Sequence, residues 1–207
     1  NQIPGQIEEY APGLVHESGG GDSFSVFWAD TRNNQLQFFA RDFGAPFNRE
    51  GDQDILVQDQ ALSRVKAARA PDGSHVIIYL SFEDDPDDPT LEMMWFDAAW
   101  IPRWSSPVTV SLDASPTWQY YTVAVDTSGR AVVAWWDRTS TTNGLLYQII
   151  DTAGSRVLFG DLTLSTSSSV EYYDIALDGL PDGSMAVGWV EYDSGDSHVL
   201  YTRVTST

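Results

Sequence analysis

The sequence contains no cysteine and a single lysine, Lys66, and both absences exclude classes of protein. Without cysteine the chain has no disulfide framework and no zinc site built on thiolates. Lysine and arginine together number 11 against 30 aspartates and glutamates, which gives a formal net charge of -19. Such a chain repels the phosphates of nucleic acid and of anionic lipid, so we expect neither nucleic acid nor membrane insertion among its interactions.

Long apolar runs, helical periodicity and common catalytic motifs are also missing. No apolar run approaches the roughly 18 residues of a membrane-spanning helix, and no stretch shows the apolar spacing of an amphipathic helix. His16, His75 and His198 are far apart and form no His-x-x-x-His pair. There is no Gly-x-Ser-x-Gly elbow, and no glycine-rich phosphate loop precedes a helix. The sequence therefore favours an all-β protein without an evident catalytic centre.

A fourfold internal repeat is the main feature that is present. Each repeat has a turn followed by a β-rich run ending in an aromatic residue: Asp22–Trp28, Gly73–Tyr79, Gly129–Trp135 and Gly183–Trp189. These aromatics lie 51, 56 and 54 residues apart. A period of about 50 residues with several short strands per unit is typical of a propeller. We predict one all-β domain over 1–207, a β-propeller with repeats at 8–60, 61–113, 114–166 and 167–207.

The third repeat predicts the structure of one blade. Its four expected antiparallel strands are Tyr120–Asp126, Arg130–Trp136, Leu145–Asp151 and Leu162–Leu164. The second of these is almost wholly apolar, which suits a strand buried on both faces. Four antiparallel strands in about 52 residues are typical of a propeller blade. The other repeats follow, with third strands at Leu36–Arg41, Leu91–Phe96 and Val199–Val204 and fourth strands at Ile55–Val57 and Val108–Val110.

The fourth repeat has no fourth strand of its own in the sequence. The segment 1–7 could supply this strand and close the ring of four blades, which would remove exposed sheet edges. Pro4 suits such an edge strand because proline has no N–H to donate. The alternative is a truncated array whose ends pair with another chain, which would make an oligomer.

Two of the repeats resemble a known group in sequence. Phe27–Arg32 and Ala134–Arg138 are similar to the Trp-x-Asp-x-Arg type repeats of bacterial secreted β-propellers. The resemblance covers all four repeats in period, but the motif only in the first and third. It implies a propeller fold and an extracellular or cell-surface protein, often with a glycan-binding role. The Asp-box of sialidases does not fit, because Asp126, Gly129 and Trp135 are spaced too widely.

The loops are expected to divide between two ends of the sheets. Loops joining second and third strands, and loops between repeats, are irregular and should meet at one end, where function concentrates. The acidic loop Glu83–Pro89 belongs to this end. Its candidate Ca²⁺ ligands are Asp84, Asp85, Asp87 and Asp88, since Ca²⁺ takes six to eight oxygen ligands. The other interpretation is a solvated acidic hairpin tip. General solubility, adaptation to salt and calcium binding could each explain the acidity.

The aromatic residues fall into two groups. Trp28, Tyr79, Trp135 and Trp189 occupy equivalent positions and are predicted to lie in the core or between blades. The others break the repeat, and an exposed ring beside hydrogen-bonding groups can stack on a sugar. The candidate ligand-binding residues are Trp118, Tyr120, Tyr121 and Asp113 at the irregular end, and next Trp100 and Trp104, which flank Ile101–Arg103. Packing between blades is the alternative for these residues.

Three functions are compatible with these observations. The first is a non-catalytic extracellular module that binds a glycan or another cell-surface component. The second is a structural or assembly propeller that contacts other proteins through incomplete ends or exposed tryptophans. The third is a fragment of a glycoside-active enzyme, because the separation of a catalytic carboxylate pair depends on the fold. Ca²⁺ is the one cofactor that the sequence suggests.

Overall fold

The computed structural model describes residues 13–16, 24–30, 37–44, 48–49, 55–58, 63–81, 90–111, 116–138, 143–158, 162–166, 170–180 and 182–205. Strands and turns make up these residues, and none of them is helical. The prediction of an all-β protein is therefore confirmed.

The strands form four antiparallel sheets that follow one another along the chain. Sheet A contains β1 Gly13–His16, β2 Phe24–Asp30, β3 Gln37–Gly44, β4 Asn48–Arg49 and β5 Ile55–Gln58. Sheet B contains β6 Ser63–Arg69, β7 His75–Ser81, β8 Thr90–Phe96 and β9 Val108–Thr109. Sheet C contains β10 Pro116–Val125, β11 Ala131–Arg138, β12 Asn143–Ile150 and β13 Leu162–Thr166. Sheet D contains β14 Glu171–Gly179, β15 Met185–Asp193 and β16 Asp196–Val204.

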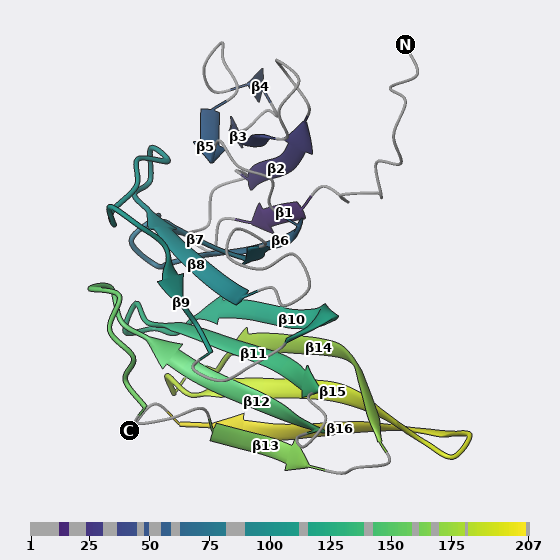
Figure 1. Cartoon of the computed structure of the whole chain (residues 1–207). Coiled ribbons are helices and arrows are strands. Elements are labelled where there is room, and N and C mark those ends of the chain that lie inside the picture. Colours follow the sequence, from purple (N-terminus) through teal and green to yellow (C-terminus); the bar gives the residue numbers. More distant parts are fainter. Residues whose placement is uncertain are drawn as a thin grey trace, which may run out of the picture.

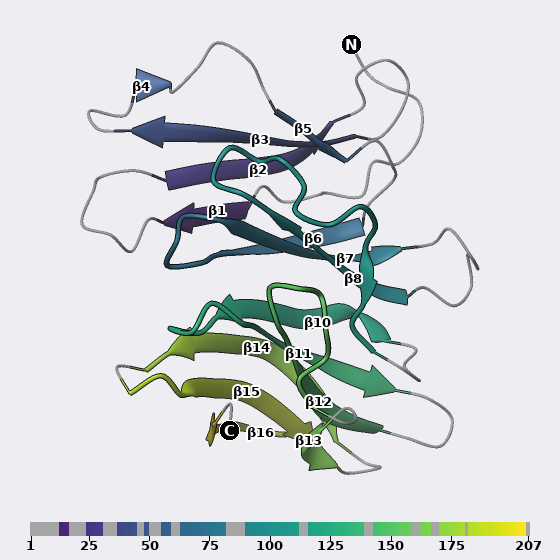
Figure 2. The same ribbon diagram turned by 90° about the vertical axis from the view of Figure 1, so that its left-hand side faces the viewer.

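The four sheets are stacked in chain order from A to D (Figures 1 and 2). The first strands of neighbouring sheets contact one another, β1 with β6, β6 with β10 and β10 with β14. No comparable contact joins β14 to β1 in the part of the chain that the structure describes, and sheets B and C lie between them in both views. Residues 1–7 lie outside the described residues. A ring of four blades closed by this segment therefore stays a prediction.

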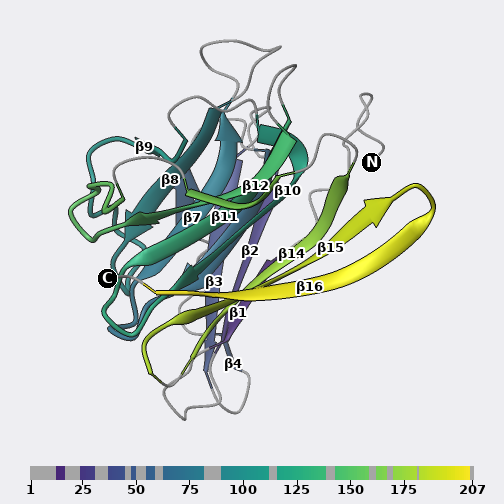
Figure 3. The same cartoon turned by 90° about the horizontal axis from the view of Figure 1, so that it is seen from below.

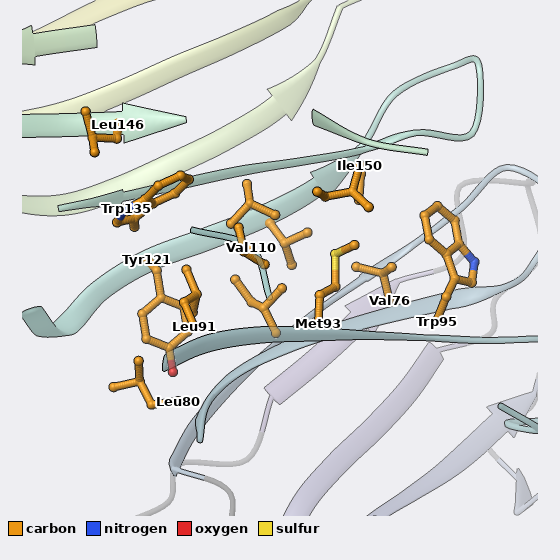
Figure 4. Close-up of a cluster of buried hydrophobic side chains, with 14 of the residues drawn as sticks. Val76, Leu80, Leu91, Met93, Trp95, Val110, Tyr121, Trp135, Leu146 and Ile150 are labelled. Atoms are coloured by element: carbon orange, nitrogen blue, oxygen red, sulfur yellow. The ribbon is translucent and has the colours of Figure 1, made fainter. Parts of the chain in front are cut away.

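The stacking explains the burial of the second strands. Every residue of β7 is buried, because sheet A covers one of its faces and sheet C the other. Tyr79, Trp135 and Trp189 are buried, as predicted from the repeat, while Trp28 is half-buried. The largest core cluster lies between sheets B and C and includes Leu91 and Trp135 (Figure 4).

No described strand covers the face of sheet D that lies away from sheet C (Figure 3). The register pairs Val190 with Val199 in sheet D, as it pairs Trp136 with Leu145 in sheet C. Leu145 is 0% exposed under sheet D, whereas Val199 is 80% exposed. The same position of the repeat is thus core in one sheet and surface in the next.

Five hairpin turns share one hydrogen-bond pattern. In each five-residue turn, the backbone N–H of the first residue donates to the carbonyl of the fifth, and the N–H of the fourth residue donates to the carbonyl of the first. The N···O distances are 2.8 to 3.1 Å. The five turns are 70–74, 97–101, 126–130, 151–155 and 180–184. The fourth position has a positive φ in all of them and is glycine in four. The exception is Trp100, with φ 61°. Three of these turns, at 70–74, 126–130 and 180–184, lead into the second strands β7, β11 and β15.

Asp72 caps the first of these turns. Its carboxylate accepts hydrogen bonds from the hydroxyl and the backbone N–H of Ser74, and forms an ion pair with Arg103 at 2.8 Å. The Ser74 hydroxyl, and after it Arg103, lower the pKa of Asp72 from 3.8 to about 2, against the opposing effect of burial. The folded state thus favours the ionised carboxylate more than the unfolded state does.

We expect Asp72→Asn to destabilise the protein at neutral pH and not at pH 2. Because the folded pKa is the lower one, the stabilisation is fully present above 3.8 and is lost as the pH falls towards about 2. The side chain is largely exposed, so the loss is about 0.5–1 kcal/mol, or roughly 1–4 °C in Tm. Melting curves of both proteins between pH 2 and 7 measure it. A Tm difference that persisted at pH 2 would contradict the charge effect.

Candidate functional site

An open cleft at the junction of sheets C and D is lined by three tyrosines. Its volume is about 430 Å³. The lining residues come from four strands: Tyr120 from β10, Tyr173 and Asp174 from β14, Val190 and Tyr192 from β15, and Ser197 from β16. The β15–β16 hairpin loop adjoins the cleft, which therefore lies at the end of the sheets predicted to be irregular.

A buried tryptophan holds two of the tyrosine rings in place. The rings of Tyr120 and Tyr173 meet edge to face, with centroids 5.0 Å apart, and Trp136 lies 5.5 Å from Tyr120 and 6.1 Å from Tyr173. Trp136 Nε1 donates to Asn143 Oδ1 at 2.6 Å, and Asn143 Nδ2 donates to the Val170 carbonyl at 2.7 Å. This chain of contacts ties sheet C to Val170, the residue that precedes β14 of sheet D.

A β-bulge shapes the wall of the cleft in β14. The register shifts between Tyr173, which pairs with Val190, and Ala176, which pairs with Gly188. Asp174 within this bulge has φ 47°, a left-handed conformation that aspartate tolerates better than most residues. Asp174 is exposed. Bulges redirect side chains and are common beside functional sites, and this one brings a carboxylate beside the tyrosines.

The second acidic group at the cleft is Glu171. The Tyr173 hydroxyl donates a hydrogen bond to Glu171 Oε2. This hydrogen bond is the main cause that raises the pKa of Tyr173 to about 12. Tyr173 therefore stays protonated and uncharged at neutral pH. None of the six lining residues carries a positive charge.

These groups can bind a polyhydroxylated ligand. Tyrosine rings offer apolar faces for stacking, and the Asp174 carboxylate can accept two hydrogen bonds from neighbouring hydroxyls. Tyr192, which is 41% exposed, and Ser197 add further hydroxyl groups. Ring faces with a few polar groups converging on them are typical of small-molecule sites.

One of the predicted ligand-binding residues lies at this cleft. Tyr120 lines it, and its role in binding stays a prediction. Tyr121 does not, because neighbouring residues of a strand face opposite sides and Tyr121 is buried in the core between sheets B and C (Figure 4). Trp118 lies in β10, but its side chain is outside the described part of the chain, as is the whole of Asp113.

The second predicted pair, Trp100 and Trp104, does not reach the cleft. Trp100 is only 2% exposed, because one ring face stacks on His75 at 4.0 Å. Its assignment as an exposed sugar-stacking residue was wrong. Trp104 is half-buried, meets Trp95 edge to face at 5.9 Å and donates from Nε1 to the Thr152 carbonyl at 2.9 Å. Packing between sheets, the alternative interpretation, describes both residues.

The predicted calcium ligands Asp84, Asp85, Asp87 and Asp88 lie outside the described residues, so calcium binding there stays a prediction. Among the described residues, no three histidine, aspartate or glutamate side chains are grouped as a metal site requires.

Two other features lie where neighbouring sheets meet. Ser25, Asp42 and His75 meet between sheets A and B, but Ser25 and His75 are buried and the Ser25 hydroxyl donates to Asp42 at 2.5 Å. This network joins two sheets and offers no accessible nucleophile. A cavity of about 240 Å³ beside Asp72 and Trp95 is bordered by the regular turns.

The sequence analysis missed Tyr173, Asp174, Tyr192 and Ser197. One signal was available for Tyr173, since the pair Tyr172-Tyr173 near the start of β14 repeats the pair Tyr120-Tyr121 in β10. The contribution of β15 and β16 has no comparable sequence signal.

No protein-family model and no curated protein sequence matches this chain. Solved structures share its fold. A protein of unknown function from Dyadobacter fermentans superposes with a TM-score of 0.58 over 93% of this chain and 65% of its own, at 12% identity. A PL25 ulvan lyase superposes with a TM-score of 0.63 over 98% of this chain and 57% of its own, at 8% identity. An endo-arabinase from Bacteroides thetaiotaomicron superposes with a TM-score of 0.53 over 97% of this chain and 76% of its own, at 11% identity.

The chain spans 65% and 57% of the length of the first two of these proteins. At such low identity the similarity concerns the fold alone. In the described part of the chain, no helix is long and apolar enough to cross a membrane.

Proposed function

We propose that this chain is a non-catalytic, extracellular or cell-surface glycan-binding module, and that the cleft of Tyr120, Tyr173, Asp174 and Tyr192 is its binding site. The observation that carries this proposal is the meeting of three tyrosines with a carboxylate turned outward by a bulge. Aromatic stacking, combined with hydrogen bonds that sugar hydroxyls donate to a carboxylate, suits the alternating apolar and polar faces of a sugar ring. The fold similarity to glycan-active proteins supports it.

Binding without catalysis fits the acidic groups of the cleft. Glycoside hydrolysis usually needs two carboxyl groups placed on either side of the scissile bond. Among the described residues that line the cleft, Asp174 alone carries a carboxyl group, and the neighbouring Glu171 accepts a hydrogen bond from the Tyr173 hydroxyl. We further propose that the four sheets are blades of a propeller, in keeping with their antiparallel strand order and stacking.

We expect Tyr192→Ala to weaken glycan binding tenfold to hundredfold while the protein stays folded. Removing one stacked aromatic ring costs roughly 1–3 kcal/mol of affinity, and Tyr192 is exposed enough that its loss leaves the core intact. Calorimetric titration with arabinan, galactan, xylan and cello-oligosaccharides measures the change. Tyr201→Ala is the matched control, an exposed tyrosine of the same sheet that does not line the cleft. Equal binding by both variants would remove the cleft from the proposal.

A second candidate function is assembly, and the uncovered face of sheet D favours it. Val199 and Tyr201 project from this face, while the equivalent Leu145 of sheet C lies under the next sheet. The occupant we propose is a second copy of this chain, stacked on sheet D as sheet D is stacked on sheet C. This contact would continue the series of sheet-to-sheet interfaces within the chain.

We expect the protein to dimerise with rising concentration and Val199→Glu to shift it to the monomer. A buried unpaired carboxylate opposes sheet stacking, so the dimer affinity should fall tenfold or more. Light scattering on a size-exclusion column measures the mass, and Thr205→Glu, an exposed substitution just beyond β16, is the control. A wild-type monomer at the highest concentration would rule out assembly through this face.

A further inference from the structure

The charge of the cleft points to the class of glycan that it accepts. We propose, on the basis of the glycan-binding function above, that the cleft selects uncharged sugar chains and rejects chains that carry carboxylate or sulfate groups. The structural observation is that Asp174 is the one charged residue among the six that line the cleft, and that a second carboxylate, Glu171, is held at its edge.

A sugar bound against Tyr173 would lie close to both carboxylates. Its hydroxyls can donate to Asp174, whose two oxygens offer several acceptor positions. A uronate or sulfate group at the same place would bring a third negative charge and no donor. Anionic ligands are usually bound by arginine or lysine, and neither is among the described residues that line this cleft.

Three features around the cleft act in the same direction. The Tyr173 hydroxyl donates its hydrogen to Glu171, so towards a ligand it is an acceptor that suits a sugar hydroxyl and offers nothing to an anionic oxygen. Trp136 and Asn143, which form the base beneath the tyrosines, are uncharged. The whole chain carries a formal charge of -19, which repels a polyanion at distances up to the Debye length, about 8–10 Å at physiological salt.

The fold alone would not suggest this preference. The ulvan lyase that shares the fold was solved with a bound saccharide containing glucuronate and sulfated rhamnose. The six lining residues of the present cleft have no cation to pair with such groups. The side chains of this cleft therefore favour a class of ligand different from the one bound by the ulvan lyase.

Matched polymers test the inference. Galactan, mannan and cello-oligosaccharides are titrated beside the same materials oxidised at C6, so that each pair differs in a primary hydroxyl or a carboxylate. We expect at least one uncharged member to bind, and its oxidised partner to bind tenfold or more weakly at low salt. Raising the salt concentration from 20 to 500 mM should reduce the difference in affinity between the uncharged and the oxidised polymer, because salt screens the repulsion between negative charges.

Asp174→Asn supplies the decisive variant. Asparagine has the same shape and also tolerates the left-handed conformation of residue 174, while the negative charge is removed. We expect the variant to bind the oxidised polymer severalfold more tightly than the wild type does, and thermal melting verifies its fold.

The outcomes separate the two proposals. An oxidised polymer that bound as tightly as its uncharged partner, or an unchanged ratio in Asp174→Asn, would overturn the selectivity and leave glycan binding standing. Failure of every polymer, oxidised or not, to bind would overturn the glycan-binding function and this inference with it.

Discussion

Trp135→Ala should lower the free energy of unfolding by about 3–5 kcal/mol, as expected for deleting a fully buried large aromatic side chain. Trp135 is completely buried in the cluster between sheets B and C. Figure 4 shows it with Tyr121 and Leu91, which come from different sheets. Because the surrounding strands are hydrogen-bonded on both sides, they cannot collapse into the cavity. Urea denaturation followed by tryptophan fluorescence and circular dichroism measures the loss.

Two further variants make the result specific. Trp135→Phe keeps most of the ring packing and removes an indole N–H that has no hydrogen-bond partner among the described residues, so it should cost much less than the alanine variant. Tyr201→Ala, at a position 87% exposed, should change stability by less than about 0.5 kcal/mol. A loss below 1 kcal/mol for Trp135→Ala would mean that this cluster does not join the two sheets.

The strands could be predicted because each is determined by nearby residues. In the third repeat, Gly129 and Gly154 occupy the positive-φ position of two hairpin turns, and the apolar run between Arg130 and Trp136 predicts the buried strand β11. These signals recur with a period close to 50 residues, so each repeat supports the interpretation of the others. Strand boundaries differ from the predicted ones by a few residues, as is usual for such patterns.

The cleft could be predicted only in part because it depends on how the sheets stack. The sequence places Tyr120 and Tyr121 on opposite faces of one strand, but it does not indicate which face meets sheet D. Tyr192 and Ser197 reach the cleft across two further strands of sheet D. The bulge that exposes Asp174 depends on a local mismatch of register with β15, for which the sequence gives no signal such as glycine.

Trp100 illustrates a different kind of error. The sequence analysis named it as a candidate for stacking on a sugar, because it is one of the aromatic residues that break the repeat. The available signal was its position, because the related turns at 126–130 and 151–155 have glycine where Trp100 stands. A tryptophan that replaces a positive-φ glycine needs compensating contacts. The structure provides them between sheets A and B.

Trp100→Ala should destabilise the protein by about 3–5 kcal/mol, and Trp100→Gly should be the less damaging of the two. Both variants lose the stacking on His75, the contact with Phe96 and the hydrogen bond from Nε1 to Asp42 Oδ1 at 3.1 Å. Alanine also keeps the unfavourable left-handed conformation at residue 100, where glycine is free of steric strain. The glycine variant should therefore be more stable than the alanine variant by about 1 kcal/mol.

This order of stability is the reverse of the usual one, because glycine within a helix or strand normally makes a protein less stable than alanine does. Chemical denaturation of the two variants gives the difference directly, and Ile101→Ala, at the exposed next residue of the same turn, is the control for a change that leaves the contact with sheet A intact. An alanine variant as stable as the glycine variant would show that residue 100 does not hold the left-handed conformation. A small loss in both variants would show instead that Trp100 does not fasten sheet B to sheet A, since burial of its ring and the hydrogen bond to Asp42 are the contacts that both substitutions remove.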